Sequence, residues 1–191
     1  MAHPFDKKQA LNFLELYRIG MHATPRAWAH KGENLMHAFE VLIAASDPNS
    51  FHLNLSDQAF MLAGMSAEVH LKAMITNDPL ARCVVTASSE PGAGPDRKLW
   101  KAFRSHDLIE LARIALLPLD DRQHTIATAL SQYIYWRGRY VVPTAKGIDD
   151  LLPVEREDRL FGPIHHVSSA EVRDLLWHVV NVLKARLYPP T

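Results

Sequence analysis

The sequence contains a single cysteine, Cys83, among its 191 residues. One cysteine excludes an internal disulfide and is typical of proteins that fold in a reducing compartment. The formal net charge is zero, because 21 basic side chains are matched by 21 acidic ones. No global positive field therefore favours nucleic acid, and an RNA partner would have to meet a local basic patch.

Long apolar runs are also missing. The first residues, MAHPFDKKQALNF, contain no apolar stretch like that of a secretory signal, and no run approaches the length of a membrane span. We therefore expect a cytoplasmic protein without a membrane partner. With 48% hydrophobic and 22% charged residues, the composition is that of an ordinary globular chain. The length suits a single domain with a core of its own.

Histidine is abundant, with 11 residues, but its spacing does not suggest a metal site. No pair follows the His-x3-His pattern, and one cysteine leaves no zinc-like cluster. The adjacent His165 and His166 lie beside Gly162-Pro163, in a stretch that is typical of a loop. A metal-binding helical bundle would carry a repeated Glu-x-x-His pattern, and none is found. We expect neither a metal nor a cofactor.

The spacing of apolar residues predicts an all-α fold, because their period is that of helices throughout and no convincing strand appears. Breaks such as Thr24-Pro25 and Pro118 separate the expected helices. We predict an up-down bundle of about six helices in one domain spanning residues 1–191, with a core of about 55–188 and N-terminal helices 6–45 packed on it. The expected helices cover residues 6–22, about 31–45, 56–77, 105–117, 120–137 and 168–187.

The helix predicted over residues 56–77 is expected to lie at the centre of the bundle. Its apolar residues fall all round the helix instead of on one stripe, which is typical of a buried helix. Ser56 is predicted as its N-cap. Glu68, His70 and Lys72 interrupt the apolar run in its second half, and Glu68 and Lys72 are four residues apart, in the order that favours an ion pair. We expect this pair either to be satisfied inside the fold or to belong to a site.

Two further helix starts carry capping signals. In Ser105-His106-Asp107, the serine or the aspartate can accept the free amide protons of a first turn. The spelling S-x-x-E from Ser168 is that of a capping box. Residues 144–167, just before it, show no clean period. So long an irregular segment in a compact domain is expected to hold a short helix, to move or to cover a site.

The last predicted helix carries the sharpest candidate for chemistry. Arg173, Asp174 and His178 lie off its apolar stripe. A carboxylate four residues from an imidazole can fix its tautomer and raise its pKa, while an arginine can hold a phosphate. These groups suffice for metal-free RNA cleavage, in which a histidine moves protons while the 2′-hydroxyl attacks the adjacent phosphate. Arg173 and His178 are about 140° apart on a helix, so a groove between helices or a second copy is required.

The spacing of this motif carries little weight by itself. From 13 arginines and 11 histidines, about two matches to Arg-x4-6-His are expected by chance, and a bare match is weak evidence. Three are found, of which only the one starting at Arg173 lies on a predicted helix with a polar residue after the arginine. The alternative is a solvated helix flank with an ordinary Asp–His pair.

Residues 133–140, YIYWRGRY, interleave aromatic side chains with Arg137 and Arg139. This mixture can stack on bases and contact phosphates. The alternative is a helix end whose aromatic side chains belong to the core and whose arginines meet the last carbonyls.

Three stretches resemble signature elements of the HEPN-like helical-bundle proteins. The stretch SHDLIELAR is similar to a GHDLxxLA element, and YIYWRGRYVVP is similar to a WxGRYPxP element of one subgroup. Ser105 stands in place of the usual glycine, and Val141-Val142-Pro143 replaces the tighter proline pattern. Arg173-Asp174-x3-His178 resembles the R-x4-6-H motif of the superfamily. The three stretches are residues 62–74 (LAGMSAEVHLKAM), 105–113 and 133–143.

The resemblance implies an all-α, often dimeric protein. Many HEPN-like proteins are metal-independent ribonucleases of toxin–antitoxin or phage-defence systems, with the arginine and histidine at the dimer interface. Others lack activity and bind RNA, a nucleotide or a nucleotidyltransferase partner. The resemblance also makes Glu68 and Lys72 part of a structural signature, together with His106 and Asp107. We expect Glu68 to be bonded near the start of the helix that contains His106.

The sequence therefore supports two hypotheses about function. In the first, the protein is a homodimeric endoribonuclease with RNA as substrate and an antitoxin as a further partner. Arg173 would hold the scissile phosphate, His178 would act as acid or base, and Asp174 would orient His178. Local positive charge would come from Arg137, Arg139 and Lys184. In the second, the protein is a non-catalytic helical module that binds RNA, a nucleotide or a protein partner.

Overall fold

The protein was analysed as a computed structural model, which describes residues 24–47, 55–79, 81, 103–137 and 167–189. Within these ranges the regular structure is helical and contains no strand, so the predicted all-α class is confirmed there. The helix predicted over 6–22 and most of the irregular segment 144–167, including His165 and His166, lie outside the described residues. The described helices are α2 (Pro25–Ala45), α3 (Ser56–Asn77), α6 (Leu108–Ile114), α7 (Asp121–Gln132), the π-helical η1 (Tyr133–Arg137) and α9 (Ser169–Leu187).

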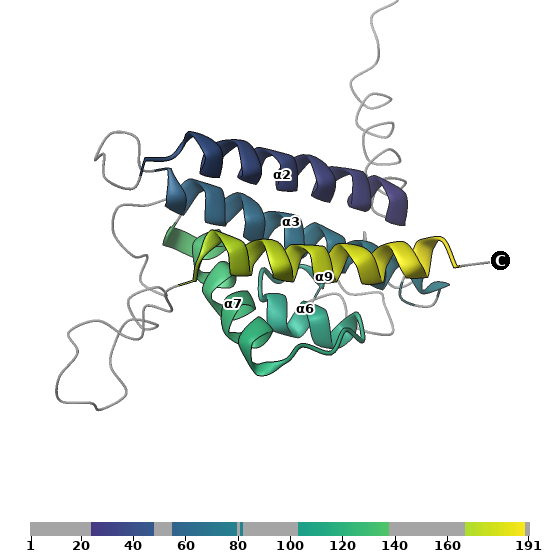
Figure 1. The fold of residues 1–191 in the computed structure, drawn as a ribbon. Coiled ribbons are helices and arrows are strands. Elements are labelled where there is room, and N and C mark those ends of the chain that lie inside the picture. Colours follow the sequence, from purple (N-terminus) through teal and green to yellow (C-terminus); the bar gives the residue numbers. More distant parts are fainter. Residues whose placement is uncertain (1–23, 48–54, 80, 82–102, 138–166, 190–191) are drawn as a thin grey trace, which may run out of the picture.

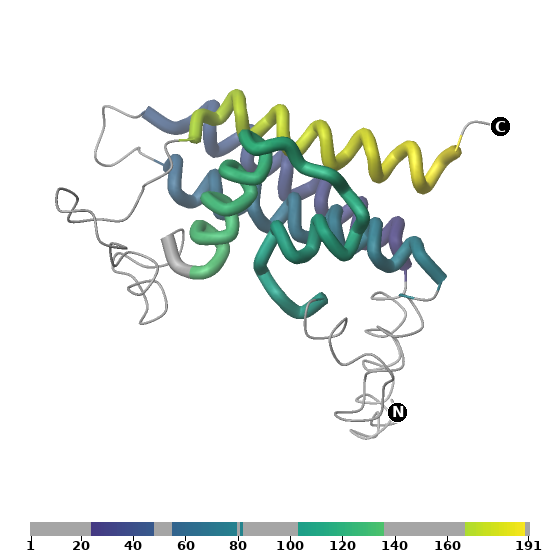
Figure 2. Tube along the Cα trace, turned by 90° about the horizontal axis from the view of Figure 1, so that it is seen from below, coloured from purple at the N-terminus to yellow at the C-terminus, as the bar shows by residue number. Residues whose placement is uncertain are grey.

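Helix α3 lies at the centre of this arrangement and contacts every other described helix. Helices α2 and α9 run along it, while α6 and α7 pack beneath (Figure 1). Seen from below, the long helices α2, α3 and α9 run side by side, and the shorter α6 and α7 lie together against them (Figure 2). None of the described helices is both long and apolar enough to cross a membrane.

The burial of α3 follows its sequence. All residues from 66 to 76 are buried, so the prediction of a buried central helix over residues 56–77 is confirmed. The prediction of Ser56 as N-cap is wrong, because Leu55 takes that position and Ser56 is the first helical residue. The backbone N–H of Leu55 instead donates to the hydroxyl of Ser46, at the end of α2, at 3.0 Å. A side chain at the end of another helix thus binds the backbone amide of the N-cap residue.

Small residues allow the neighbours of α3 to approach its backbone. A Cβ atom added at Gly64 would lie 2.8 Å from Cγ1 of Ile134 and 2.9 Å from the carbonyl oxygen of Leu130. The core around this contact includes an aromatic series in which Phe60 packs against Phe39 and Tyr133. Each large apolar side chain buried in this way contributes about 1.5–3 kcal/mol.

Helix α2 begins at Pro25, six residues before the predicted start. We interpreted Thr24-Pro25 as a break, but proline is favoured at the first position of a helix, where its missing N–H has no partner to lose. Near the C-terminal end of α9, α6 stops at Ile114 and the chain turns through Leu116, which has a positive φ of 51°. Arg186 of α9 donates to the carbonyl oxygens of Ala115 and Leu116 and so binds this turn.

The capping signals predicted at Asp107 and at Ser168 are confirmed. Asp107 accepts the backbone N–H groups of Ile109 and Glu110, so α6 begins after it, at Leu108. Ser168 and Glu171 form the reciprocal capping box of α9, which ends at Leu187 as expected. The helix predicted over 120–137 is instead divided, because α7 ends at Gln132 and η1 continues with wider π-helical turns.

The Glu68–Lys72 pair is satisfied inside the fold. Lys72 Nζ donates to Glu68 Oε1 at 2.6 Å, and the two side chains are only 8% and 9% exposed. The other carboxylate oxygen of Glu68 lies 2.8 Å from Nδ1 of His106, just before α6. Our expectation that Glu68 is bonded near the start of that helix is therefore confirmed. Lys72 also lies over the ring of Phe103, 5.4 Å from its centroid.

The pKa of Glu68 reflects these contacts. Burial by itself raises the pKa, but the hydrogen bond with His106 and the charge of Lys72 outweigh it and hold the pKa below its ordinary value. The carboxylate is therefore ionised in the folded protein. Its contribution to stability is fully present above about pH 4.5 and is lost as the pH falls through the lowered folded pKa.

Replacing Glu68 with Ala should destabilise the fold strongly, because Lys72 would remain buried without its counter-charge. We expect a loss of about 3–5 kcal/mol in the free energy of unfolding, measured by urea denaturation. The double variant Glu68→Leu, Lys72→Met should lose less than the single variant, since it removes both charges. Glu110→Ala, which breaks the exposed Glu110–Arg113 pair, serves as the control and should have a much smaller effect. A double variant that is less stable than Glu68→Ala would contradict this account.

Candidate functional site

Arg173 binds a carboxylate of its own chain. Its Nε and Nη2 atoms lie 2.8 Å from the carboxylate of Glu40 on α2, and its guanidinium lies 5.9 Å from the ring centroid of Phe39. Hydrogen bonding to Glu40 raises the pKa of Arg173 above its ordinary value. The positive charge that we assigned to a scissile phosphate is therefore already paired, and it joins α9 to α2.

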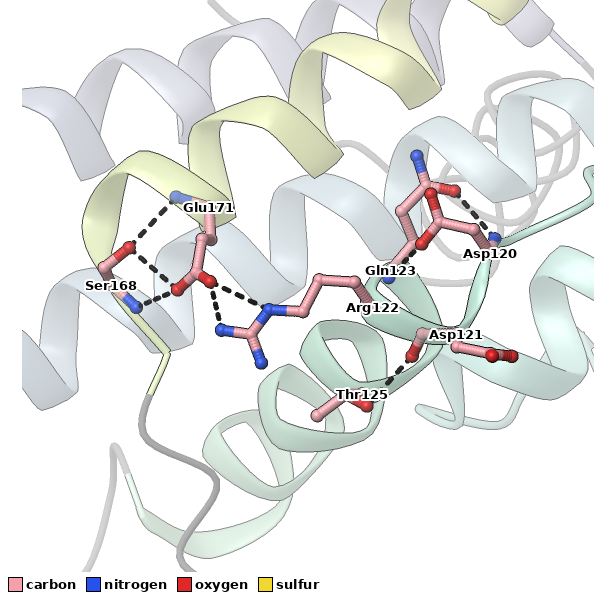
Figure 3. A network of polar contacts seen from close by, with 7 residues as sticks. All are labelled: Asp120, Asp121, Arg122, Gln123, Thr125, Ser168 and Glu171. Carbon is pink, nitrogen blue, oxygen red and sulfur yellow. Dashed lines mark hydrogen bonds and ion pairs between the residues drawn. The ribbon is translucent and has the colours of Figure 1, made fainter.

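His178 lies on the other flank of α9. It follows Glu171 by seven residues, which is two helical turns less about 20°, so the two side chains share one side. Glu171 forms an ion pair with Arg122 of α7 (Figure 3). Arg173 thus faces α2 while His178 lies on the side of α7, and a single chain does not bring them together. Asp174 is exposed, and no hydrogen bond joins it to His178.

The Arg122–Glu171 pair fixes the start of α9. Glu171 accepts the backbone N–H and the hydroxyl of Ser168, both at 2.8 Å, and two N–H groups of the Arg122 guanidinium (Figure 3). The bond from the Ser168 backbone, followed by the one from Arg122, lowers the pKa of Glu171 to about 2. Two ion pairs, one on each flank, thus hold α9 to its neighbours.

The proposed RNA-binding side chains are only partly described. Lys184 is exposed on α9, with Nζ 3.8 Å from Glu33 Oε1. Arg137 belongs to η1, but its side chain is outside the described part, as is the whole of Arg139. The clustering of these three cations stays a prediction.

A cavity that we did not predict lies between α2, α3 and α9. Its volume is about 240 Å³. Its polar lining comes from all three helices and includes two cations and one carboxylate besides two histidines. These polar residues are Arg26, His30, Glu33, His70 and Lys184.

The rest of the lining is apolar or aromatic. Tyr188, just after α9, carries the guanidinium of Arg26 over its ring, 5.3 Å from the centroid. Small-molecule sites are typically apolar hollows with a few polar groups that fix orientation. The arrangement here has that composition. The apolar wall consists of Ala29, Val180, Leu183 and Leu187.

His70 is the most buried of the polar residues that line the cavity and is only 1% exposed. The hydroxyl of Ser66 donates to the carbonyl oxygen of Gly32 at 2.8 Å, and its oxygen lies 3.4 Å from Nδ1 of His70. Because the hydroxyl proton points to Gly32, we assign the ring proton to Nδ1, which donates to Ser66. Nε2 is then an acceptor, and it has no hydrogen-bond partner among the described residues.

Burial lowers the pKa of His70, although its hydrogen bond with Ser66 acts in the opposite direction. The imidazole is therefore neutral near pH 7. Helix α2 holds the ring closely, since a Cβ atom added at Gly32 would lie 2.5 Å from Cε1 of His70. The sequence did contain a signal for this site, because His70 is a lone imidazole in the apolar run of the helix predicted to be buried.

No family model, no curated protein and no solved structure matches this chain. Among the residues that the structure describes, no group of three His, Cys, Asp or Glu side chains is placed to hold a metal ion. The site must therefore be interpreted from its own geometry and charges.

The lowered pKa of His70 predicts a stability that depends on pH. Its contribution is fully present above about pH 6.5 and is lost as the pH falls from there through the folded pKa, because only the unfolded chain binds the proton readily. Urea unfolding from pH 8 to pH 5 should show a steeper loss for wild type than for His70→Gln. His30→Gln, which changes an exposed histidine on α2, should keep the wild-type slope. Equal slopes for wild type and His70→Gln would show that His70 is not held neutral.

Proposed function

We propose that this protein is a non-catalytic, HEPN-like helical module that binds a small ligand in the cavity between α2, α3 and α9. The observation that carries the proposal is the Nε2 atom of His70, a residue that lines the cavity. This atom is buried and has no hydrogen-bond partner among the described residues. An unpaired buried polar atom costs about 1–3 kcal/mol. A ligand or water that reaches this atom would remove the cost.

The placement of Arg173 and His178 supports a binding function over a catalytic one. Arg173 is neutralised by Glu40, and His178 lies on the opposite flank of α9. The cavity, by contrast, gathers polar groups from three helices around one volume. The resemblance to HEPN-like proteins that bind RNA or nucleotides without cleaving them is a further, independent support.

The proposal predicts that a small molecule stabilises the protein through the cavity. A suitable panel contains nucleoside monophosphates, ribose phosphate, amino acids and one-ring carboxylates. At a concentration 100-fold above its dissociation constant, a bound ligand should add about 2.7 kcal/mol to stability. We expect at least one compound to raise the melting temperature and to shift the amide signals of residues that line the cavity, such as Val180 and Leu183.

A filled cavity provides the control. Ala29→Phe places a ring in the cavity, whereas Ala185→Phe makes the same change at an exposed position of α9. Binding should be lost in the first variant and kept in the second. The proposal fails if no compound binds, or if Ala29→Phe binds as well as wild type.

One observation favours a second candidate, the metal-independent endoribonuclease of a toxin–antitoxin or phage-defence kind. The Nε2 atom of His178 has no hydrogen-bond partner among the described residues, so its lone pair or proton is not engaged; the atom is buried, however, and a substrate would have to gain access to it. Activity would require a homodimer that places His178 of one copy near Arg173 of the other. It would also require phosphate to compete with Glu40 for Arg173.

Complementation tests this candidate. Arg173→Ala and His178→Ala should each abolish cleavage of a labelled RNA in the presence of a chelator. Because a shared site takes one residue from each copy, mixing the two inactive variants should restore about a quarter of the wild-type rate. Glu40→Gln should increase cleavage, since it frees Arg173. Equal cleavage by wild type and both single variants would rule out the enzyme.

A further inference from the structure

We propose that the cavity binds a one-ring organic carboxylate that carries a hydroxyl or N–H group away from its carboxylate. This inference rests on the proposed binding function and names its ligand class. It combines an acceptor at the buried end of the cavity, an excess of one positive charge along α2 and α9, and an apolar wall between them.

The buried end requires a donor. Nδ1 of His70 is used by Ser66, and the Ser66 hydroxyl is used by Gly32. Burial lowers the pKa of His70, so Nε2 presents a lone pair and no proton. A ligand that reaches Nε2 with an oxygen lacking a proton would leave two acceptors facing each other. A hydroxyl or N–H group of the ligand can instead donate a hydrogen bond to Nε2.

The charged lining favours a single negative charge. Arg26 and Lys184 are positive, and Glu33, which lies 3.8 Å from Lys184, is negative. The sum is one positive charge, which a carboxylate balances. A phosphate monoester carries a charge of about −1.5 to −2 at pH 7, so part of its negative charge would stay unbalanced in the cavity. Arg26 is exposed and rests on the ring of Tyr188, so its planar guanidinium can meet both oxygens of a carboxylate.

The size of the cavity limits the rest of the molecule. An engineered cavity of about 150 Å³ holds benzene, and the cavity here measures about 240 Å³. The additional volume suits one ring with two polar substituents. The side chains of Ala29, Val180 and Leu183 supply the apolar surface that such a ring needs.

Matched probes test the assignment on the full-length chain. Titration calorimetry would compare 3-hydroxybenzoate and 4-hydroxybenzoate with benzoate and with their methoxy analogues. We expect at least one hydroxybenzoate to bind, and its methoxy analogue to bind about ten-fold more weakly or worse, because a site built around a hydrogen bond rejects the analogue that lacks it. Equal binding of the hydroxyl and methoxy compounds would overturn the inference.

Two variants locate the contacts. Arg26→Ala should weaken every carboxylate about ten-fold or more, whereas Lys31→Ala, an exposed cation outside the cavity lining, should not. His70→Leu should abolish the preference for hydroxyl over methoxy. If that variant does not fold, Arg26→Ala still decides the case, since unchanged binding in it would overturn the inference.

The outcomes also separate this inference from the proposed function. If another compound of the panel binds in the cavity and the hydroxybenzoates do not, the ligand class is wrong and the binding function stands. If nothing in either set binds, both are wrong, and the cavity holds only water that satisfies His70.

Discussion

The structure depends on one constraint, namely that α3 is buried on all sides and yet carries ionisable groups. Burying an isolated charge costs several kcal/mol, so each such group must find a polar partner within α3 or on a segment packed against it. Glu68 meets Lys72 within α3 and His106 before α6, while His70 meets Ser66, whose hydroxyl reaches Gly32 on α2. These contacts fix where α2 and α6 lie against the central helix.

Charged side chains of α9 are also paired with partners on neighbouring helices, here at the surface of the bundle. Its polar residues are arranged as two flanks, with Arg173 paired to Glu40 on one side and Glu171 paired to Arg122 on the other. Arg173, which suggests chemistry in the sequence, therefore serves to position α9 against α2. This placement leaves its C-terminal half, with Val180 and Lys184, to form one wall of the cavity over His70. Among the described residues, the buried Nε2 atoms of His70 and His178 have no hydrogen-bond partner and can still accept one.

Local signals predicted local features well. The bounds of α3, the capping box at Ser168 and the cap at Asp107 are all recorded in residues close together in the chain. Errors arose where a distant residue intervened or where a signal had two meanings. The N-cap position falls on Leu55, whose amide is bound by the distant Ser46, and not on Ser56, while Pro25 begins α2 where we expected a break. The family resemblance correctly led to the Glu68–His106 contact, while its implications for function stay proposals.

The sequence by itself determined the helical class, the burial of the central helix and the ion pair within it, because periodicity and i,i+4 spacing are properties of neighbouring residues. It could not determine which carboxylate Arg173 would meet, since Glu40 is 133 residues away. Nor could it show that Arg26, His70 and Lys184 line one cavity. Those relations exist only once three helices are packed together, and the candidate site is therefore a product of the tertiary structure.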